Sequence, residues 1–245
     1  MSRWKAAAIH SSISAAIACA AAALMFIWFS PYFRAAGAPE LILLLVGVDV
    51  CVGPLLTLII FRSGKRGLLF DLACIGVLQT AALVYGLYVM SQSRPVFLVA
   101  AVDRFELIAA NEISDSDLAD GQEPQFRSRS WWGPRVVGVA LPTDLEARND
   151  LVFSGAGGRD IQNLPKYYCN YEKVRTSLSE RAQKLEILRQ KHPQDQQLID
   201  DWLSRTDRTE ASTVWIPLKG RKTDLVMLLD KTTAETLGTI AIDPW

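Results

Sequence analysis

The sequence predicts a membrane protein in which three N-terminal transmembrane helices precede an α+β domain with a small, mostly antiparallel sheet. Three observations support this class. Apolar runs cover residues 6–29, 41–61 and 68–90, and each reaches the roughly 20 residues that a hydrocarbon core about 30 Å thick requires. The rest of the chain, residues 92–245, has the mixed composition of a soluble domain. In that part, strand-like runs alternate with amphipathic stretches of helical period.

The charged residues predict the orientation of the spans. Arg3 and Lys5 precede the first span, and three basic residues lie in the turn 62–66 between the second and third. Because loops rich in Lys and Arg stay in the cytoplasm, we expect a cytoplasmic N-terminus. Three crossings then place the C-terminal domain outside, which in a bacterium is the periplasm, with the spans in the inner membrane.

The net charge of each part bears on possible partners. Residues 1–91 sum to +3, so the remaining residues sum to −3, because the whole chain is neutral. Binding to nucleic-acid phosphates needs a concentrated basic face, and a mildly acidic domain does not provide one. We therefore expect no nucleic-acid partner. The bilayer itself is the partner that the apolar runs predict.

The first apolar run has an alternative interpretation. Ala36-Gly37-Ala38 is similar to a signal-peptidase cleavage site. The run is longer than the apolar region of a typical signal peptide, which favours a retained span. Cleavage would leave two spans and the same orientation of the domain. The run is also rich in alanine, and small residues allow helices to pack closely in lipid, either within this protein or with a foreign helix.

Polar residues within the second and third spans are candidate contacts for another helix. Asp49 lies near the middle of span two, and Gln79 and Thr80 of the antiparallel span three reach a similar depth. A carboxyl group at mid-membrane costs roughly 2.5–3.5 kcal/mol on insertion scales, so it needs a partner or a proton. The sequence leaves two interpretations open, a contact with another membrane helix or an internal hydrogen bond. His10, near the inner end of span one, is interpreted as an interfacial residue.

The domain after residue 91 is predicted from alternation and turn signals. Strands are expected at 96–102, 104–109, 135–141 and 239–242, with a hairpin formed by 214–218 and 224–230. A short helix is expected at 114–118 with Ser114 as its N-cap, and another after Thr143. The apolar stripe Val174, Leu178, Ala182, Leu185 and Leu188 predicts the longest helix, from about 170 to 191. A further helix is expected at 195–204.

Two features of this domain are candidates for recognition or packing. Trp131 and Trp132 are adjacent, and exposed aromatic pairs often anchor interfaces, while core packing is an equal alternative. Cys169 is the one cysteine outside the spans, so the domain cannot form an internal disulfide. We expect Cys169 to be a small buried apolar residue, and the alternative is a thiol that forms mixed disulfides.

The sequence lacks the signatures of catalysis. It has two histidines, His10 and His192, on opposite sides of the expected membrane, and no metal-ligand spacing, nucleophile elbow or paired-cysteine motif. The glycine-rich segment 154–158 lacks the ending of a phosphate loop. A Cys–His pair would need Cys169 and His192. We therefore expect a protein without enzymatic activity, metal or cofactor.

Three stretches of the sequence resemble one family. They are Gly47–Gly67, with Gly53-Pro54-Leu55-Leu56-Thr57-Leu58 and Gly64-Lys65-Arg66-Gly67; Phe70-Asp71-Leu72 to Tyr85-Gly86-Leu87-Tyr88; and Arg94-Pro95-Val96-Phe97 to Val102-Asp103-Arg104-Phe105-Glu106. Together they resemble the type IV pilin accessory proteins of the TfpX/TfpZ family. The likeness covers residues 1 to about 115 and is looser beyond.

This resemblance implies an inner-membrane protein that helps a cognate major pilin to accumulate and to assemble into pili, with other assembly components as further partners. It implies no catalytic residue. A pilin waits in the membrane as one apolar helix with an outer head, so we expect Asp49, Gln79 and Thr80 to contact the helix and Trp131 and Trp132 to contact the head. The alternatives are a membrane-anchored sensor domain and a pilin-modifying protein.

Overall fold

The computed structural model describes residues 2–156 and 160–245, and it divides into two compact units. Met1–Phe33 and Gly37–Arg94 form the first unit. Arg34–Ala36 and Pro95–Trp245 form the second. The short segment between the first two spans therefore belongs to the second unit, together with the C-terminal domain.

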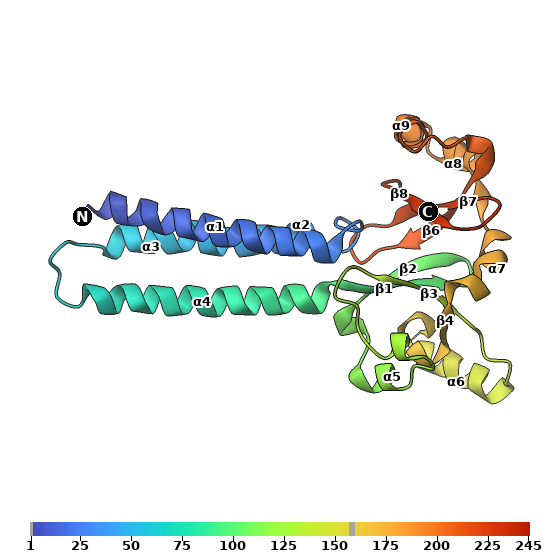
Figure 1. The fold of residues 1–245 in the computed structure, drawn as a ribbon, viewed down its shortest axis with the longest axis horizontal. Coiled ribbons are helices and arrows are strands. Elements are labelled where there is room, and N and C mark those ends of the chain that lie inside the picture. The colour runs from blue at the N-terminus through green and yellow to red at the C-terminus, as the bar shows by residue number, and fades with distance from the viewer. Residues whose placement is uncertain (1, 157–159) are drawn as a thin grey trace. The chain divides into compact units, whose positions relative to one another are not determined.

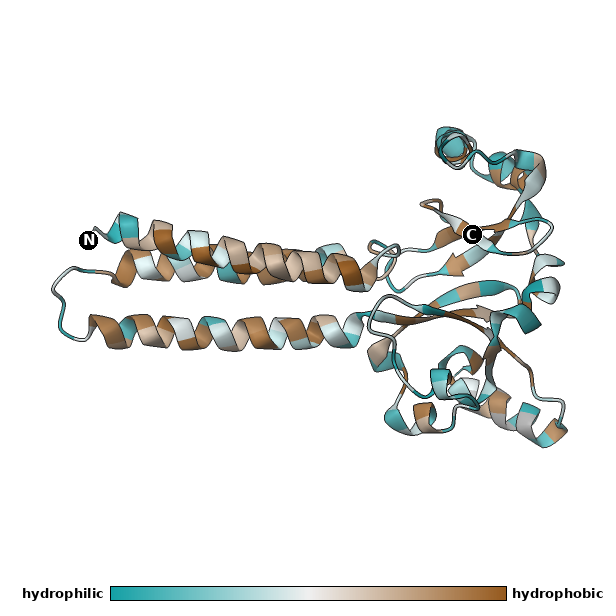
Figure 2. Cartoon of the chain, in the orientation of Figure 1, coloured by the Kyte–Doolittle hydropathy of each residue, from teal (hydrophilic) through white to brown (hydrophobic). Residues whose placement is uncertain are grey.

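The first unit consists of three helices that are long and apolar enough to cross a membrane, as the sequence predicts (Figures 1 and 2). Span one is α1 (Arg3–Phe29) and span three is α4 (Leu68–Ser93). Span two is continuous from Ala38 to Ile60 but contains three segments. These are α2 (Ala38–Val46), the π-helical segment η1 (Gly47–Val52) and α3 (Gly53–Ile60).

Span one packs along span two (Figure 1). Its buried small residues, Ala7, Ser14, Ala18 and Ala21, recur at helical spacing and so form one face. This packing supports the interpretation that the small residues serve contacts within the protein. Span three is packed much less: 6% of its most apolar stretch is buried, against 33% for span one and 28% for span two.

The second unit is built on one eight-stranded sheet with the order β4-β3-β1-β2-β6-β7-β8, and β5 pairs with β6. The strands are β1 (Pro95–Ala101), β2 (Arg104–Ala109), β3 (Arg135–Val139), β4 (Tyr168–Asn170), β5 (Gln183–Lys184), β6 (Thr213–Lys219), β7 (Leu225–Asp230) and β8 (Thr236–Ile240). Most neighbours are antiparallel, but β1–β3 and β2–β6 are parallel. The predicted α+β class and the hairpin β6–β7 are confirmed.

The longer helices of this unit are α5 (Asp115–Ala119), α6 (Leu145–Ala156), α7 (Arg175–Ser179), α8 (Leu185–Lys191) and α9 (Gln196–Thr206). Short 3-10 turns occur at Ala110–Glu112, Pro124–Phe126, Ile161–Asn163, Pro165–Tyr167, Tyr171–Lys173, Pro193–Asp195 and Glu210–Ser212. Ser114 caps α5 as predicted, because its Oγ accepts from the N–H of Asp117. The helix expected after Thr143 begins at Leu145, and residues 157–159 of the glycine-rich segment lie outside the described residues.

The sheet carries two apolar cores. The first is formed by strands β1, β3 and β4 with α5, and Phe97, Val137 and Phe126 lie fully buried in it. The second is formed by β6, β7 and β8 with α8 and α9, and it contains Leu188 and Trp215. In Figure 1 the helices α8 and α9 lie beside β6–β8, whereas α5 and α6 lie toward the β4 edge.

The long helix predicted from 170 to 191 is wrong. The chain there forms β4, a 3-10 turn, α7, the short strand β5 and then α8. Leu178, Leu185 and Leu188 of the stripe are buried, and Val174 and Ala182 are half-buried, but tertiary pairing interrupts the helix. Gln183 and Lys184 pair with β6, and the indole Nε1 of Trp215 donates to the Lys184 carbonyl at 3.0 Å.

The turn between β7 and β8 gives a testable pH dependence. Asp230 Oδ1 accepts from the N–H groups of Thr232 and Thr233, both at 2.9 Å, and Oδ2 accepts from Arg208 at 2.8 Å. These backbone hydrogen bonds, with the guanidinium, hold the pKa of the Asp230 carboxyl below its usual value of about 4. Its stabilisation is therefore present above that pH and is lost as the pH falls through the folded-state pKa.

We expect Asp230→Asn to lower the urea midpoint of the full-length protein in detergent at neutral pH. The difference from the wild type should narrow below about pH 4 and close once the pH has fallen through the depressed folded-state pKa, because the wild-type carboxyl then also loses its charge. Circular dichroism of the aromatic bands at several pH values would measure both midpoints. A difference that does not change with pH would contradict this account of the turn.

Candidate functional site within the membrane-spanning helices

The second span changes its backbone hydrogen-bond pattern where Asp49 lies. In the π-helical segment Gly47–Val52, a carbonyl accepts from the N–H five residues ahead. For Asp49 that residue is Pro54, which has no N–H. The Gln79 side chain of α4 provides a donor instead, with Nε2 at 3.3 Å from the Asp49 carbonyl oxygen. Such π-helical turns occur frequently at functional sites.

A glycine makes room for this contact between spans two and three. A Cβ atom on Gly53 would lie 1.9 Å from Nε2 of Gln79, so the amide occupies the space that a larger residue would fill. Asp49 and Gln79 are therefore brought together as the depth argument predicts. The bond is made by the Asp49 backbone, however, and it leaves the carboxyl group available.

The carboxyl group of Asp49 is buried without complete hydrogen bonding. The residue is 5% exposed, and within the described part of the chain its Oδ1 atom has no hydrogen-bond partner. The bilayer core contains no water that could form the missing hydrogen bond, so an unsatisfied polar atom there costs several kcal/mol. Asp49 Oδ1 is therefore an acceptor that the described residues leave without a donor.

Two cavities meet at Asp49. The first, about 200 Å³, lies between span two and span three. Asp49 is the acidic residue that lines this cavity, and the other lining residues include Leu44, Leu45, Tyr85 and Gly86. Leu44 and Tyr85 are largely exposed, so this cavity reaches the surface of the bundle. Its lining is otherwise almost entirely apolar.

The second cavity, about 170 Å³, lies between span one and span three. Thr80 lines it together with Asp49 and Gln79, so the structure brings the three predicted intramembrane residues to one place. His10 and Ser14 line the same cavity from span one. The second cavity is therefore the more polar of the two.

His10, Ser14 and Thr57 are site residues that the sequence analysis missed. His10 is not merely interfacial: its Nδ1 shares a hydrogen bond of 2.6 Å with Oγ1 of Thr57, which is buried in span two. This bond joins span one to span two beside the second cavity. The available signal was the presence of isolated polar residues within apolar runs, because such residues usually face a partner.

Enlarging Gly53 should disconnect Gln79 from the Asp49 backbone. We expect Gly53→Ala to lower the stability of the helical bundle by about 1 kcal/mol, the range for one interhelical hydrogen bond in a membrane. In a Gln79→Ala background the same substitution should cost less, because the displaced amide is already absent. Thermal unfolding of the four proteins in one detergent would measure the coupling. Additive losses would show that Gly53 and Gln79 act independently.

The predicted pair Trp131 and Trp132 lies in the second unit, in the loop before β3. Their side chains are 55% and 79% exposed, so core packing is wrong for both. Arginine side chains hold the surrounding loop. Arg129 donates to the carbonyls of Ala110 and Ile113 at 2.8 and 2.5 Å, and Arg135 donates to the Gln125 carbonyl.

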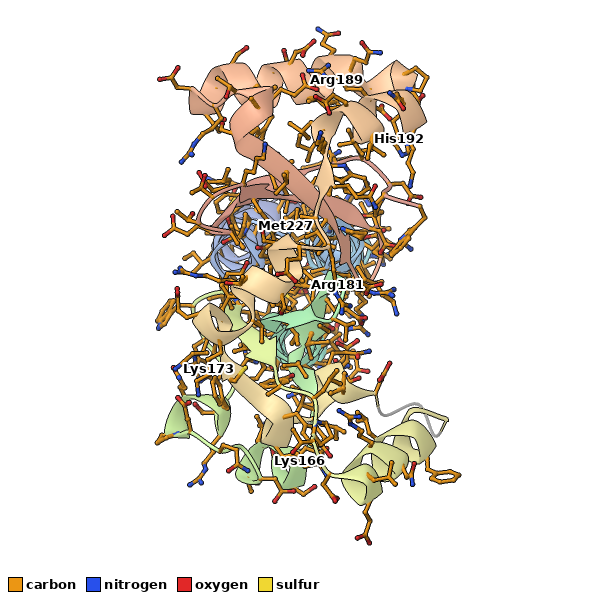
Figure 3. All side chains as sticks on the ribbon, turned by 90° about the vertical axis from the view of Figure 1, so that its right-hand side faces the viewer. Lys166, Lys173, Arg181, Arg189, His192 and Met227 are labelled. Carbon is orange, nitrogen blue, oxygen red and sulfur yellow. The ribbon has the colours of Figure 1, made fainter. Side chains whose placement is uncertain are left out.

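Cys169 and His192 are not placed as a catalytic pair. Cys169 is buried on the edge strand β4, as expected for a small apolar residue, and burial raises the pKa of its thiol. His192 ends α8, beside the β6 side of the sheet. Strands β4 and β6 are four positions apart, which at about 4.8 Å per strand is roughly 19 Å. In Figure 3, His192 lies at one end of this unit and Lys166 and Lys173, which flank Cys169 in sequence, lie toward the other.

Comparison with known proteins identifies relatives over almost the whole chain. The chain is 30% identical over 236 residues to "Fimbrial assembly protein, serogroup I" and to "Fimbrial assembly protein, serogroup E1", both of Dichelobacter nodosus. Each match covers 93% of this chain and 90% of the relative.

A third relative, "Fimbrial assembly protein, serogroups C1 and C2" of the same organism, is 34% identical over 118 residues. That match covers 46% of this chain and 90% of the relative. No family model and no solved structure matches the chain. The identity and coverage of the two longer matches show that this chain belongs to the family of fimbrial assembly proteins.

Proposed function

We propose that this protein is an accessory protein of the major type IV pilin, which binds the cognate pilin in the bacterial inner membrane, stabilises it and promotes its assembly. The unsatisfied carboxyl oxygen of Asp49, at the meeting point of two cavities, carries the proposal. The names of the relatives, which describe fimbrial assembly, and the resemblance to the TfpX/TfpZ family support it.

The chemistry of the site favours a transmembrane helix as the ligand. The cavity between spans two and three is lined almost entirely by apolar side chains, which lipid-facing helices pack against. A donor on the incoming helix would satisfy Oδ1 of Asp49 at a depth where water cannot. Most of the apolar stretch of span three is unburied, so this span offers further surface on which the incoming helix can pack.

The proposed binding is non-catalytic and needs no metal or cofactor. The orientation of the protein in the membrane is inferred from its basic residues, with the N-terminus in the cytoplasm and residues 92–245 in the periplasm. A periplasmic domain next to the membrane could contact the head of the same pilin. Two linked contacts would raise the apparent affinity by effective concentration.

Co-purification tests the binding. The tagged full-length protein, extracted with a mild detergent from cells that express the cognate pilin, should retain pilin. An unrelated membrane complex from the same extract provides the control for gentle solubilisation. Failure to recover pilin while that complex stays intact would contradict the proposal.

Deleting the gene separates stabilisation from delivery. We expect a low total pilin level if the protein protects pilin in the membrane, and a normal level without surface fibres if it delivers pilin to the assembly machinery. Immunoblots of whole cells and of sheared surface fibres measure the two quantities separately. Unchanged pilin and unchanged fibres would count against both roles.

A further inference from the structure

We propose that the tryptophan loop, residues 128–134, docks in the interface of the lipid bilayer at the membrane face where span three ends. This inference does not depend on the identity of the protein partner. It concerns Trp131 and Trp132, whose exposure the domain fold leaves unexplained. A rigid loop that presents two adjacent large aromatic side chains marks an interaction surface.

Strand register places the loop at a defined end of the sheet. Span three ends at Ser93 and β1 begins at Pro95, so one residue, Arg94, joins them in sequence. Strand β3 runs parallel to β1, and Arg135 is the register partner of Phe97. Trp132 precedes Arg135 by three residues, as Arg94 precedes Phe97. The loop therefore lies at the end of the sheet that is joined to the membrane span.

A second chain segment marks the same end of the sheet. Residues 34–36 connect span one to span two, so they emerge at the membrane face where span three ends. They belong to the sheet-containing unit, and the Ala35 carbonyl accepts from the N–H of Lys222 at 2.8 Å. Lys222 lies in the turn after β6, and β6 ends at the same end of the sheet as β2, which is antiparallel to β1.

The side chains at this end suit a lipid interface. Arg34, Arg221 and Lys222 are exposed there, as are the two tryptophans. Tryptophan concentrates at membrane–water interfaces because its ring has an apolar body and a polar N–H. Basic residues beside it are attracted to anionic headgroups. Lipid explains both the composition and the position of the loop, whereas a contact with a protein head explains the exposure alone.

Hydrogen bonds to the neighbouring chain fix the conformation of the tryptophan loop, so the loop needs little further ordering to dock. Arg129 donates to Ala110, Ile113 and Asp115, and Gly133 adopts a left-handed backbone with φ of +83° directly after Trp132. Glycine adopts this conformation without strain. A loop that is fixed before binding loses little conformational entropy on contact with the bilayer.

Depth-dependent fluorescence quenching tests the proposal on the full chain. The wild type and Trp131→Phe/Trp132→Phe would be reconstituted in vesicles of phosphatidylcholine and phosphatidylglycerol, with or without acyl chains brominated near the headgroup. The difference in emission between the two proteins reports the loop. We expect bromolipid to quench most of this difference emission, and its maximum to be blue-shifted relative to an exposed tryptophan.

A matched control places a tryptophan at the opposite end of the same strand. Leu141 is exposed and follows β3, so Leu141→Trp in the double-variant background should add emission that bromolipid leaves unchanged. Loop emission that is unquenched, or quenched no more than that of the control, would overturn the proposal. Emission that becomes protected only when pilin is co-reconstituted would also overturn it and would assign the loop to a protein contact.

Discussion

Replacing Asp49 with leucine is expected to abolish pilin recovery while the protein itself remains in the membrane at an equal or higher level. The substitution removes a carboxyl group whose insertion costs roughly 2.5–3.5 kcal/mol, so span two should insert more readily. It also removes the buried oxygen that lacks a partner and lies between the two cavities. Binding and insertion should therefore change in opposite directions, which a folding defect would not produce.

Two further variants make this result specific. Asp49→Asn keeps a hydrogen-bonding group of the same shape, and we expect it to retain part of the pilin. Asp71→Leu removes an acid from the first turn of span three, where Asp71 pairs with Lys65 and lines neither cavity. It should retain pilin fully. Immunoblots of pilin and of the tagged protein in the same membranes would measure both levels, and equal pilin recovery by all three variants would exclude Asp49 from binding.

Replacing Trp215 with alanine should cause the largest loss of stability in the sheet-containing unit, about 3–5 kcal/mol, the range for removing a buried aromatic side chain. Trp215 is fully buried in the second apolar core. Its indole also donates to the Lys184 carbonyl, which keeps β5 on β6. We therefore expect β5 to lose its protection from hydrogen exchange along with the global loss.

Conservative variants separate the two contributions of Trp215. Trp215→Phe keeps much of the apolar volume but loses the N–H donor, and we expect it to cost about 1–2 kcal/mol. Trp132→Phe, at an exposed position, should change stability by less than about 0.5 kcal/mol. Urea unfolding of the full-length proteins in detergent would rank the three variants. A Trp215→Ala protein as stable as Trp132→Phe would show that the second core does not depend on this side chain.

Local sequence patterns predicted those parts of the fold that depend on interactions between residues close in the sequence. The spans follow from hydropathy, the β6–β7 hairpin from its turn, and the Ser114 cap from a side chain and a backbone N–H three residues apart. The helix expected over 170–191 failed because this stretch pairs with distant strands, Asn170 with β3 and Gln183–Lys184 with β6. The parallel pairings of β1 with β3 and of β2 with β6 join segments that no local pattern relates.

The candidate site was predictable to a similar degree. Counting residues from the ends of antiparallel spans was enough to place Asp49, Gln79 and Thr80 at one depth, and the structure brings them together. The π-helical winding and the bond between His10 and Thr57 were not predictable. The bond depends on how the helices are rotated about their axes, and that rotation is set by packing after the spans have formed.

The parallel pairing of β2 with β6 has a mechanical consequence. It joins the two apolar cores through a short register, Phe105–Glu106 against Leu218–Lys219, whereas β1–β2 and β6–β7 pair over most of their length. A sheet with such a seam can open there while each half keeps its own core. Pulling on the chain or raising the temperature should then separate an N-terminal half from a C-terminal half before either one melts.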